Sequence, residues 1–457
     1  MKYPPHIFRE YDIRGVVGKE LTSELAFDLG RGLGEILRER KLPLRAVVGG
    51  DARLSSTEFK KQITQGLQSV NADVYDIGRC PTPLLYFGLF NLEVGGGIMV
   101  TGSHNPPEFN GFKICVGKES FYGKEIQGLR DRLEGFKELK VGRGKIQPVD
   151  LTTKYLEFLA KDFKRLIQKS RPLKVVIDCG NGVAGLLAPQ ALKLLKCDLI
   201  ELYTEPDGRF PNHHPDPTIE ENLRDLREKV IQEKADVGIG FDGDADRIGV
   251  VDERGEVIWG DRLLLIYARD LLERKPGATI ISEVKCSQQL FDDIEARGGR
   301  AMMWKAGHSL MKAKMKETKA ELGGEMSGHM FFADRFFGYD DAIYAACRLV
   351  EILVEGKRPI SQLLSDLKPL SCTPEIRIDC PDDLKFKVVS KVRERFSKEY
   401  PIIDIDGVRV VFENGWALLR ASNTQPALVM RVEAETPEAL AKIQANISEN
   451  VREFMRF

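Results

Sequence analysis

The chain has 457 residues, of which 42% are apolar and 30% charged, and its 68 basic residues nearly balance its 69 acidic ones. This length exceeds what one hydrophobic core supports, so several domains of about 100 to 150 residues are expected. The balanced charge argues against a nucleic-acid protein or a polybasic membrane binder. The eight cysteines are scattered, and no apolar run reaches the length of a membrane span. We therefore expect a soluble, cytoplasmic protein with no nucleic-acid or membrane partner.

The predicted elements follow one pattern, in which a short β-branched strand ends in a small or polar loop and an amphipathic helix comes next. The first helix starts at Thr22 or Ser23, and we expect its glycines to pack closely on a sheet: Gly30, Gly32 and Gly34. The same pattern of a strand that ends in a small or polar loop is predicted at 46–51, 174–181 and 278–283. This alternation indicates three similar α/β domains with mixed or parallel sheets.

The last part of the chain differs in kind. From Glu375 the order is strand, helix, two strands around Gly407 and Gly415, a polar loop, a strand and a final helix. Such an order predicts a fourth, α+β domain, the alternative being an extension of the third. Linker-like stretches then divide the chain into four domains: 1–150, 151–253, 254–367 and 368–457.

A polar loop follows the apolar strand 97–100 and contains Ser103. Loops at strand ends commonly present catalytic groups, and Gly102 lets the backbone turn sharply there. A phosphate on Ser103 would be stabilised by His104 and Lys113. The alternative is a Ser/Asn turn that caps the next segment.

An acidic loop lies 139 residues further on and favours the phosphate interpretation. Asp242, Asp244 and Asp246 follow the apolar strand 237–241 at alternate positions, so their side chains point to one side. Three carboxylates and a phosphate oxygen suit Mg²⁺.

Two other motifs overlap the acidic loop and are rejected. An EF-hand needs glycine where Arg247 stands, and helices rather than strands on either side. Gly238, Gly240 and Gly243 spell G-x-G-x-x-G, but that motif must open a helix, whereas a strand is predicted at 248–252.

Two loops in the third domain, 305–309 and 324–329, offer substrate contacts. Glu325, Ser327 and His329 in the second loop have the hydrogen-bonding groups that vicinal sugar hydroxyls require, although a structural histidine is the alternative. A fourth loop supplies a guanidinium, two hydroxyls and an amide for a phosphate: Arg420, Ser422, Asn423 and Thr424.

With these four loops in order, the sequence resembles the α-D-phosphohexomutases, and within them the bacterial-type phosphomannomutase/phosphoglucomutase group. The resemblance extends from Phe8-Arg9-Glu10-Tyr11-Asp12-Ile13-Arg14-Gly15 to the Arg420 loop. It implies three mixed α/β domains and a C-terminal α+β domain around a central cleft.

The resemblance also implies residue roles. Ser103 would be the phosphoserine, and Asp242, Asp244 and Asp246 would hold Mg²⁺ together with its phosphate. The groups around the transferring phosphoryl group would be Tyr11, Arg14, His104, Lys113 and Arg247. The substrate contacts would be Lys285, His308, Glu325, Ser327, His329, Arg420, Ser422, Asn423 and Thr424. The general base is left open between His329 and Lys285, and the segment 212–217 is expected to be structural despite its two histidines.

The implied reaction moves a phosphoryl group between the 1- and 6-positions of mannose or glucose phosphates. A bisphosphorylated sugar, glucose 1,6-bisphosphate or mannose 1,6-bisphosphate, would be intermediate and activator. One alternative is a phosphoglucosamine mutase, but those enzymes usually carry Gln where Met326 stands. The other is a sugar-phosphate sensor, which would be expected to lack the nucleophile or a metal ligand. We expect a monomer or a weak homo-oligomer with a hexose phosphate as its ligand.

Overall fold

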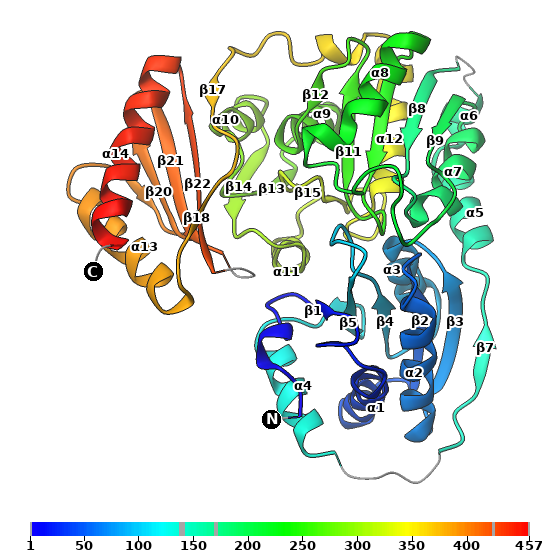
Figure 1. Cartoon of the computed structure of the whole chain (residues 1–457). Helices are drawn as coiled ribbons and strands as arrows, with labels where there is room; N and C mark the ends of the chain where they lie inside the picture. The colour runs from blue at the N-terminus through cyan, green and yellow to red at the C-terminus, as the bar shows by residue number, and fades with distance from the viewer. Residues whose placement is uncertain (1, 137–141, 169–171, 423–425, 456–457) are drawn as a thin grey trace.

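Four β-sheets follow one another along the chain, and we call the units built on them domains I to IV (Figure 1). The computed structural model describes residues 2–136, 142–168, 172–422 and 426–455. Domains I to III carry helices on both sheet faces, and domain IV has an antiparallel sheet with two helices. The expected fold class is therefore confirmed. Among the helices of these described ranges, none is long and apolar enough to cross a membrane.

Domain I has a mixed sheet of order β1-β5-β4-β2-β3-β7, with β6 beside β5. Its strands are β1 (Ile13–Val16), β2 (Arg45–Gly50), β3 (Asp73–Arg79), β4 (Gly96–Val100), β5 (Phe109–Val116), β6 (Glu119–Ser120) and β7 (Ile146–Pro148). Its helices are α1 (Ser23–Glu39), α2 (Ser56–Ser69), α3 (Thr82–Asn91) and α4 (Lys124–Glu134). Val48 of β2 belongs to the core under α1 and α2, whereas Val47 belongs to the core under α3. The sheet is therefore buried on both faces, as its apolar strands require.

Helix α1 begins as predicted but packs differently. Thr22 caps it by accepting a hydrogen bond from the Leu25 amide at 3.2 Å. A Cβ at Gly30 would overlap the Ile63 carbonyl of α2, and one at Gly34 would overlap the Val70 side chain just after α2. The expectation that these glycines pack on a sheet is wrong, because glycine spacing indicates a close approach without indicating the partner.

Domain II has the sheet order β12-β11-β10-β8-β9, in which β10 and β11 form an antiparallel pair. Its strands are β8 (Lys174–Asp178), β9 (Asp198–Leu202), β10 (Val237–Phe241), β11 (Ile248–Asp252) and β12 (Val257–Ile258). Its helices are α5 (Thr152–Asp162), α6 (Lys164–Gln168), α7 (Ala188–Leu194) and α8 (Arg224–Glu233). The acidic loop therefore joins two strands, which confirms the rejection of both the EF-hand and the dinucleotide motif.

Domain III has the sheet order β14-β13-β15-β16. Its strands are β13 (Thr279–Glu283), β14 (Arg300–Trp304), β15 (Leu322–Gly324) and β16 (Met330–Phe332). Its helices are α9 (Gly260–Arg274), α10 (Gln288–Ala296), α11 (His308–Thr318) and α12 (Ala342–Gly356). One continuous core joins α3, α5, α7, α9 and α12, so domains I to III pack as one body.

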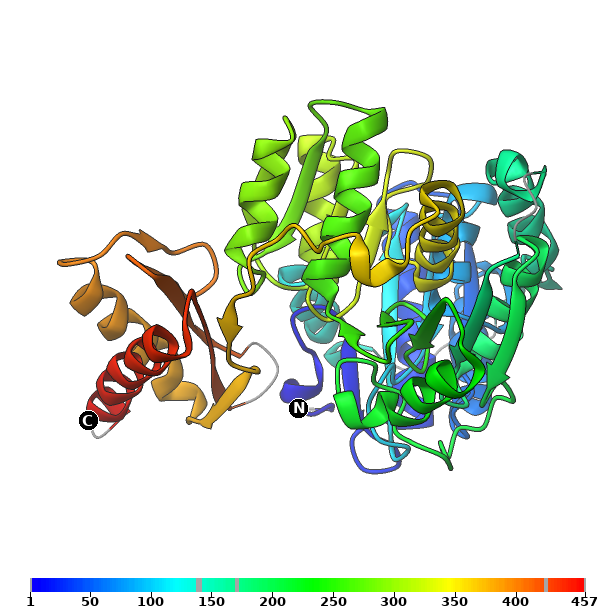
Figure 2. The ribbon, with the colours of Figure 1, turned by 90° about the horizontal axis from the view of Figure 1, so that it is seen from above.

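Domain IV stands at one side of that body, next to α10 and β14 (Figures 1 and 2). Its strands are β17 (Ser371–Cys372), β18 (Ile376–Asp379), β19 (Ile402–Ile403), β20 (Val408–Phe412), β21 (Gly415–Ala421) and β22 (Ala427–Ala434). Its helices are α13 (Asp382–Phe396) and α14 (Pro437–Met455). Residues of β21 alternate: Ala417 and Leu419 pack under the helices, while Trp416 and Leu418 pack against Val284 of domain III.

Candidate active site

Ser103 lies at the carboxyl end of β4, in the loop that leads to β5. It is 1% exposed, and its φ of 49° is in the left-handed region that residues other than glycine rarely adopt. Its Oγ donates a hydrogen bond to Asp242 Oδ2 at 3.0 Å and lies 3.0 Å from His104 Nδ1. Backbone strain at a buried hydroxyl is typical of functional sites.

Two residues that the sequence analysis missed, Asp51 and Arg53, support this loop. Asp51 Oδ2 accepts the Gly102 N–H at 3.1 Å. The Arg53 guanidinium donates to four loop carbonyls, those of Ser103 at 2.9 Å, Asn105, Pro106 at 2.6 Å and Phe109 at 2.8 Å. A Cβ at Gly102 would overlap this guanidinium, so the turn requires glycine. The only sequence signal is a charged pair directly after a buried strand.

The carboxylates of Asp242, Asp244 and Asp246 are fully buried and converge at the turn between β10 and β11. One ligand atom from each lies within 4.8 Å of the others. Among the described residues, Asp244 Oδ1 and Asp246 Oδ1 have no hydrogen-bond partner. Buried carboxylate oxygens are costly unless a cation or a donor faces them, so this all-oxygen set fits Mg²⁺.

The Lys113 ammonium, which comes from β5, contacts the acidic loop. Its Nζ donates to Asp244 Oδ2 at 2.9 Å and also to Asp246 Oδ2. Burial alone would lower the pKa of Lys113, but the two carboxylates raise it well above its ordinary value. Thr82 Oγ1 donates to the same Asp244 Oδ2 at 2.6 Å. Protein donors therefore hold Oδ2 of Asp244 and of Asp246 and leave Oδ1 of these two residues for a cation.

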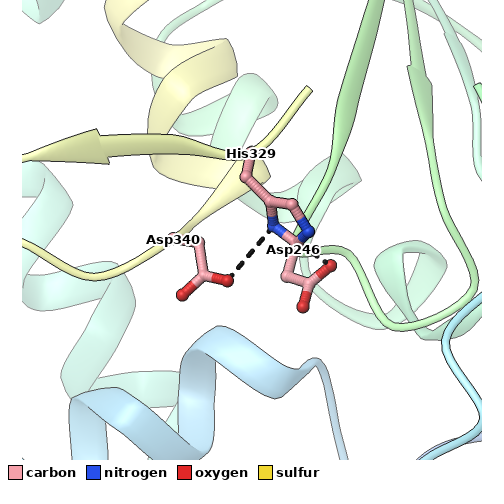
Figure 3. A group of neighbouring side chains, drawn as sticks. All are labelled: Asp246, His329 and Asp340. Carbon is pink, nitrogen blue, oxygen red and sulfur yellow. Dashed lines mark ion pairs between the residues drawn. The ribbon is translucent and has the colours of Figure 1, made fainter. Parts of the chain in front are cut away.

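Asp246 also belongs to a second buried group, with His329 and Asp340 (Figure 3). His329 Nδ1 lies 3.1 Å from Asp340 Oδ2 and 3.6 Å from Asp246 Oδ1. Arg247 Nε donates to His329 Nε2 at 3.0 Å, which places the proton of a neutral imidazole on Nδ1, toward Asp340. A metal ion at Nδ1 would need the lone pair that this proton occupies. The geometry therefore favours a carboxylate–imidazole pair over a second metal site.

Two histidines of the site, His104 and His308, are held neutral. Burial, together with Arg247 and Arg14, lowers the pKa of His104 well below its ordinary value. Burial and the Lys312 ammonium do the same to the pKa of His308. His308 stacks on the His329 ring at a centroid distance of 5.4 Å. His104 and His308 are therefore uncharged near neutral pH.

Arg14 lies on β1, with its guanidinium toward the Ser103 loop. Its Nε donates to Asp12 Oδ2 at 2.7 Å and its Nη1 to Asn105 Oδ1 at 3.3 Å. The Arg14 guanidinium therefore contacts Asn105, which follows Ser103 by two residues in the sequence.

The predicted sugar-binding loop joins β15 and β16. Glu325 Oε1 accepts the Gly307 N–H at 2.6 Å, and Ser327 Oγ donates to Glu325 Oε2 at 3.2 Å. Met326 donates its amide N–H to Glu283 Oε1 at 2.9 Å. The loop is therefore tied both to the 305–309 loop and to the end of β13.

Lys285 follows β13 and connects domains III and IV. Its Nζ lies 3.5 Å from Glu283 Oε1 and 3.4 Å from Glu375 Oε2. Burial alone would lower the pKa of Lys285, but these carboxylates raise it. Burial raises the pKa of Glu283 to about 7. Neither Glu283 nor Glu375 was singled out from sequence, where a lone glutamate gives no signal.

Arg420 lies one residue before the end of β21 and pairs with Asp406, whose Oδ2 lies 2.9 Å from Arg420 Nη2. The same Asp406 oxygen accepts the Ala306 N–H at 3.1 Å, and the Ala306 carbonyl accepts the Tyr11 hydroxyl at 2.7 Å. Ser422 lies just after β21, and its N–H donates to the Ala427 carbonyl at 2.9 Å. Asn423 and Thr424 lie outside the described residues. The contacts of Ala306 therefore link domains I, III and IV at one residue.

The histidine-rich segment 212–217 lies next to the acidic loop. His213 Nε2 lies 2.9 Å from Asp178 Oδ2, at the end of β8. A Cβ at Gly243 of the acidic loop would lie 3.4 Å from the Pro215 side chain. The structural role expected for this segment stays a prediction.

Four family models match the chain in order and describe the α/β/α domains I, II and III and the C-terminal domain of phosphoglucomutase/phosphomannomutase. They match residues 5–138, 153–255, 259–370 and 375–450. The fold and the serine–carboxylate site thus define the class of α-D-phosphohexomutases.

Individual relatives agree over the whole length. A Pseudomonas aeruginosa phosphomannomutase/phosphoglucomutase is 50% identical over 96% of this chain and 94% of its own. A Neisseria gonorrhoeae phosphoglucomutase is 42% identical over 96% of this chain and 95% of its own. The crystal structure of a Burkholderia thailandensis family protein has a TM-score of 0.92 at 42% identity, covering 99% of this chain and 98% of its own. The chain belongs to the phosphoglucomutase/phosphomannomutase family, as its sequence motifs predict.

Proposed function

We propose that the protein catalyses reversible phosphoryl transfer between the 1- and 6-positions of mannose and glucose phosphates, with Ser103 as the carrier. The observation that supports this most directly is the 3.0 Å hydrogen bond from Ser103 Oγ to Asp242 Oδ2, within the buried carboxylate group. A phosphate on this hydroxyl would lie beside Asp244 Oδ1 and Asp246 Oδ1. Mg²⁺ held there by the three aspartates would offset the charge of the phosphoryl group.

The reaction has two balanced halves. In the first, the bond between Ser103 Oγ and phosphorus breaks while phosphorus bonds to the free hydroxyl oxygen of the hexose phosphate, whose proton passes to a base. In the second, the bisphosphorylated sugar has turned end for end. The bond between phosphorus and its other ester oxygen breaks while phosphorus bonds to Ser103 Oγ, and the base returns the proton to the released sugar oxygen. Arg14, Lys113 and Arg247 supply positive charge around the transfer.

The proton acceptor in this scheme is His329. Lys285 has a raised pKa and is therefore held as an ammonium, which suits phosphate binding better than proton abstraction. In a neutral His329 the Nε2 lone pair accepts the Arg247 Nε–H at 3.0 Å, so Arg247 has to release Nε2 before this atom takes up the proton.

Sugar and distal phosphate bind at loops of domains III and IV in this scheme. In this scheme the Glu325 carboxylate accepts hydrogen bonds from sugar hydroxyls, and the Ser327 hydroxyl donates hydrogen bonds to them. Both residues have to make these hydrogen bonds in the two orientations of the substrate. Arg420 with Ser422, Asn423 and Thr424 binds the phosphate that is not being transferred, whereas Tyr11 and His308 line the region between. The four domains are proposed at 1–150, 151–253, 254–367 and 368–457, which the succession of four sheets supports.

The activator is proposed to be glucose 1,6-bisphosphate or mannose 1,6-bisphosphate. An Aspergillus fumigatus N-acetylphosphoglucosamine mutase of the same fold was solved with glucose 1,6-bisphosphate. The phosphoglucosamine alternative stays weaker here, because the relatives of 42% identity or more quoted above act on mannose or glucose phosphates by name.

The test is ³¹P NMR of the protein with Mg²⁺, a trace of glucose 1,6-bisphosphate, and mannose, glucose or glucosamine 1-phosphate in separate tubes. Formation of mannose and glucose 6-phosphates supports the proposal, and one of the two alone fixes the preference. Conversion of glucosamine 1-phosphate only would establish the alternative. No conversion in any tube would favour a sensor.

Ser103→Ala is expected to lower kcat by at least about 10⁴-fold, because the covalent carrier is lost. Circular dichroism and Tm should stay close to wild type, since alanine fills most of the same space. Ser390→Ala, at a half-buried position of α13 in domain IV, is the matched control and should keep full activity. A folded Ser103→Ala enzyme with normal turnover would refute the role of Ser103.

A further inference from the structure

The Arg53 guanidinium is fully buried directly beneath the Ser103 loop. Burial of a guanidinium costs free energy unless its donors are satisfied. Here Nη1 donates to the Pro106 and Phe109 carbonyls, and Nη2 donates to those of Ser103 and Asn105. One side chain therefore fixes four carbonyls within seven residues of chain.

These contacts constrain the backbone on both sides of the strained residue. Fixing the Ser103 and Asn105 carbonyls sets the peptide planes that follow Ser103. On the other side, Asp51 accepts the Gly102 N–H at 3.1 Å, while its own N–H donates to the Val100 carbonyl at 2.9 Å. Residues of the turn after β2 therefore fix the backbone on both sides of Ser103, and with it the φ and ψ angles of Ser103.

The Ser103 loop and the acidic loop are packed so closely that there is no room for an added methyl group between them. A Cβ on Gly243 of the acidic loop would lie 2.5 Å from the Ser103 carbonyl oxygen. A Cβ on Gly208 of domain II would likewise lie 2.5 Å from Arg53 Cα. Any shift of the Ser103 loop would therefore change the distance from Oγ to the carboxylates.

We propose that Arg53 is a positioning residue that holds Ser103 in its left-handed conformation and so aims Oγ at the site of phosphoryl transfer. The inference rests on the proposed function of Ser103 as the carrier. Arg53 itself acts only through the loop carbonyls.

Arg53→Lys tests the geometry while keeping the charge. An ammonium has three donors on one atom and cannot hold four carbonyls as the planar fork does. We expect kcat to fall about 100-fold, the usual cost of a misplacement of about 1 Å. KM for the hexose phosphate should stay within about threefold, because the proposed sugar and phosphate contacts lie in domains III and IV.

Arg348→Lys is the matched control. Arg348 of α12 is also almost fully buried, but it pairs with the Asp334 carboxylate at 2.9 Å in domain III. Both variants should lose thermal stability, whereas only Arg53→Lys should lose kcat per folded molecule. Equal losses of kcat would reduce Arg53 to a purely structural residue and overturn the inference.

Chemical rescue gives a second readout. Arg53→Ala creates a space of guanidinium size, so guanidinium at low millimolar concentration should restore kcat at least about tenfold, and methylammonium should not. Wild-type kcat in Arg53→Lys, or a rise in KM at constant kcat, would contradict the proposal. Absence of mutase activity in the wild type would instead refute the proposed function, so the two failures are distinguishable.

Discussion

Ser103 combines burial, a left-handed backbone and a hydroxyl bonded to a carboxylate. The left-handed backbone costs about 1–3 kcal/mol, whereas the hydrogen bond to Asp242 offsets the cost of burying the hydroxyl. The surrounding loop offsets the cost through Asp51 and Arg53, whose hydrogen bonds would otherwise be left unmade. The proposed phosphoryl carrier is thus set in place before any substrate arrives, which is what phosphoryl transfer by positioning requires.

Gly102→Ala tests how tightly this arrangement is packed. The added Cβ would overlap the Arg53 guanidinium, so either the loop or Arg53 must move. We expect a loss of about 1–3 kcal/mol in the free energy of unfolding and a large fall in kcat. Chemical denaturation and steady-state kinetics measure the two effects. Gly128→Ala in α4, where a Cβ meets open space, is the control and should be neutral or stabilising; equal behaviour of the two variants would show that Gly102 is not restricted.

The chemistry of single residues was predictable where several reactive types cluster in sequence. The alternate positions of the three aspartates predicted that their carboxylates lie close together, because alternate side chains at a strand end point to one side. Arg53 was not predictable, since its partners lie 50 to 56 residues away and are backbone carbonyls, which every residue has. The roles of Asn423 and Thr424 stay predictions.

The end of β13 shows how an element positions charge. Glu283 is fully buried at the last position of the strand, where the carboxyl ends of parallel strands commonly present ligand-binding groups. Its Oε1 accepts the Met326 N–H and so orients the predicted sugar-binding loop. Its negative charge attracts the Lys285 ammonium. Burial nevertheless opposes its ionisation.

A pH-dependent stability follows at Glu283. Its folded pKa of about 7 lies above the value near 4.5 of an unfolded glutamate, so its stabilising contribution is present below pH 4.5 and is lost as pH rises through 7. Glu283→Gln stays neutral, so the Tm of the variant minus that of wild type should rise by roughly 2–4 °C between pH 5 and pH 8.5. Calorimetry across that range measures it.

Glu39→Gln supplies a control, whose Tm difference from wild type should stay constant between pH 5 and pH 8.5 and change only in more acidic solution. The Arg132 guanidinium lowers the pKa of Glu39, so that contribution is present at higher pH and is lost as the carboxylate protonates on acidification. A Tm difference for Glu283→Gln that does not change with pH would contradict the prediction.

Element boundaries followed from local pattern, but packing partners did not. Strands β10 and β11 have the bounds predicted from their apolar runs, because a strand buried on both faces has a continuous apolar sequence. The glycines of α1 were assigned to a sheet and instead contact α2 and α4. Their partner depends on the tertiary arrangement, which the glycine pattern does not encode.

At the scale of the molecule, domain IV uses the two faces of its sheet differently. One face is covered by α13 and α14, and the other meets the loop of domain III that carries Lys285. Arg409, fully buried on that face, donates to the Val284 carbonyl at 2.7 Å and the Cys286 carbonyl at 2.9 Å, and its guanidinium lies 3.7 Å from the Trp416 ring centroid.

Arg409→Met should loosen this interface. Two buried carbonyls lose their donor, so domain IV and Lys285 become less well placed. We expect KM for the hexose phosphate to rise about tenfold and small-angle scattering to report a larger radius of gyration. Arg393→Met, on the exposed part of α13, is the control. Wild-type KM and an unchanged radius would show that the interface does not depend on Arg409.

The peptide groups of Ala306 and Gly307 have a further consequence. Tyr11 of domain I holds the Ala306 carbonyl, Asp406 of domain IV holds the Ala306 N–H, and Glu325 of domain III holds the Gly307 N–H. These two residues thus form a mechanical linkage among three domains. If Arg420 and Glu325 bind the sugar phosphate as proposed, the substrate would compete for the partners of this linkage. Binding at one end of the substrate would then change the contacts of Tyr11, on the side where the phosphoryl group is proposed to move.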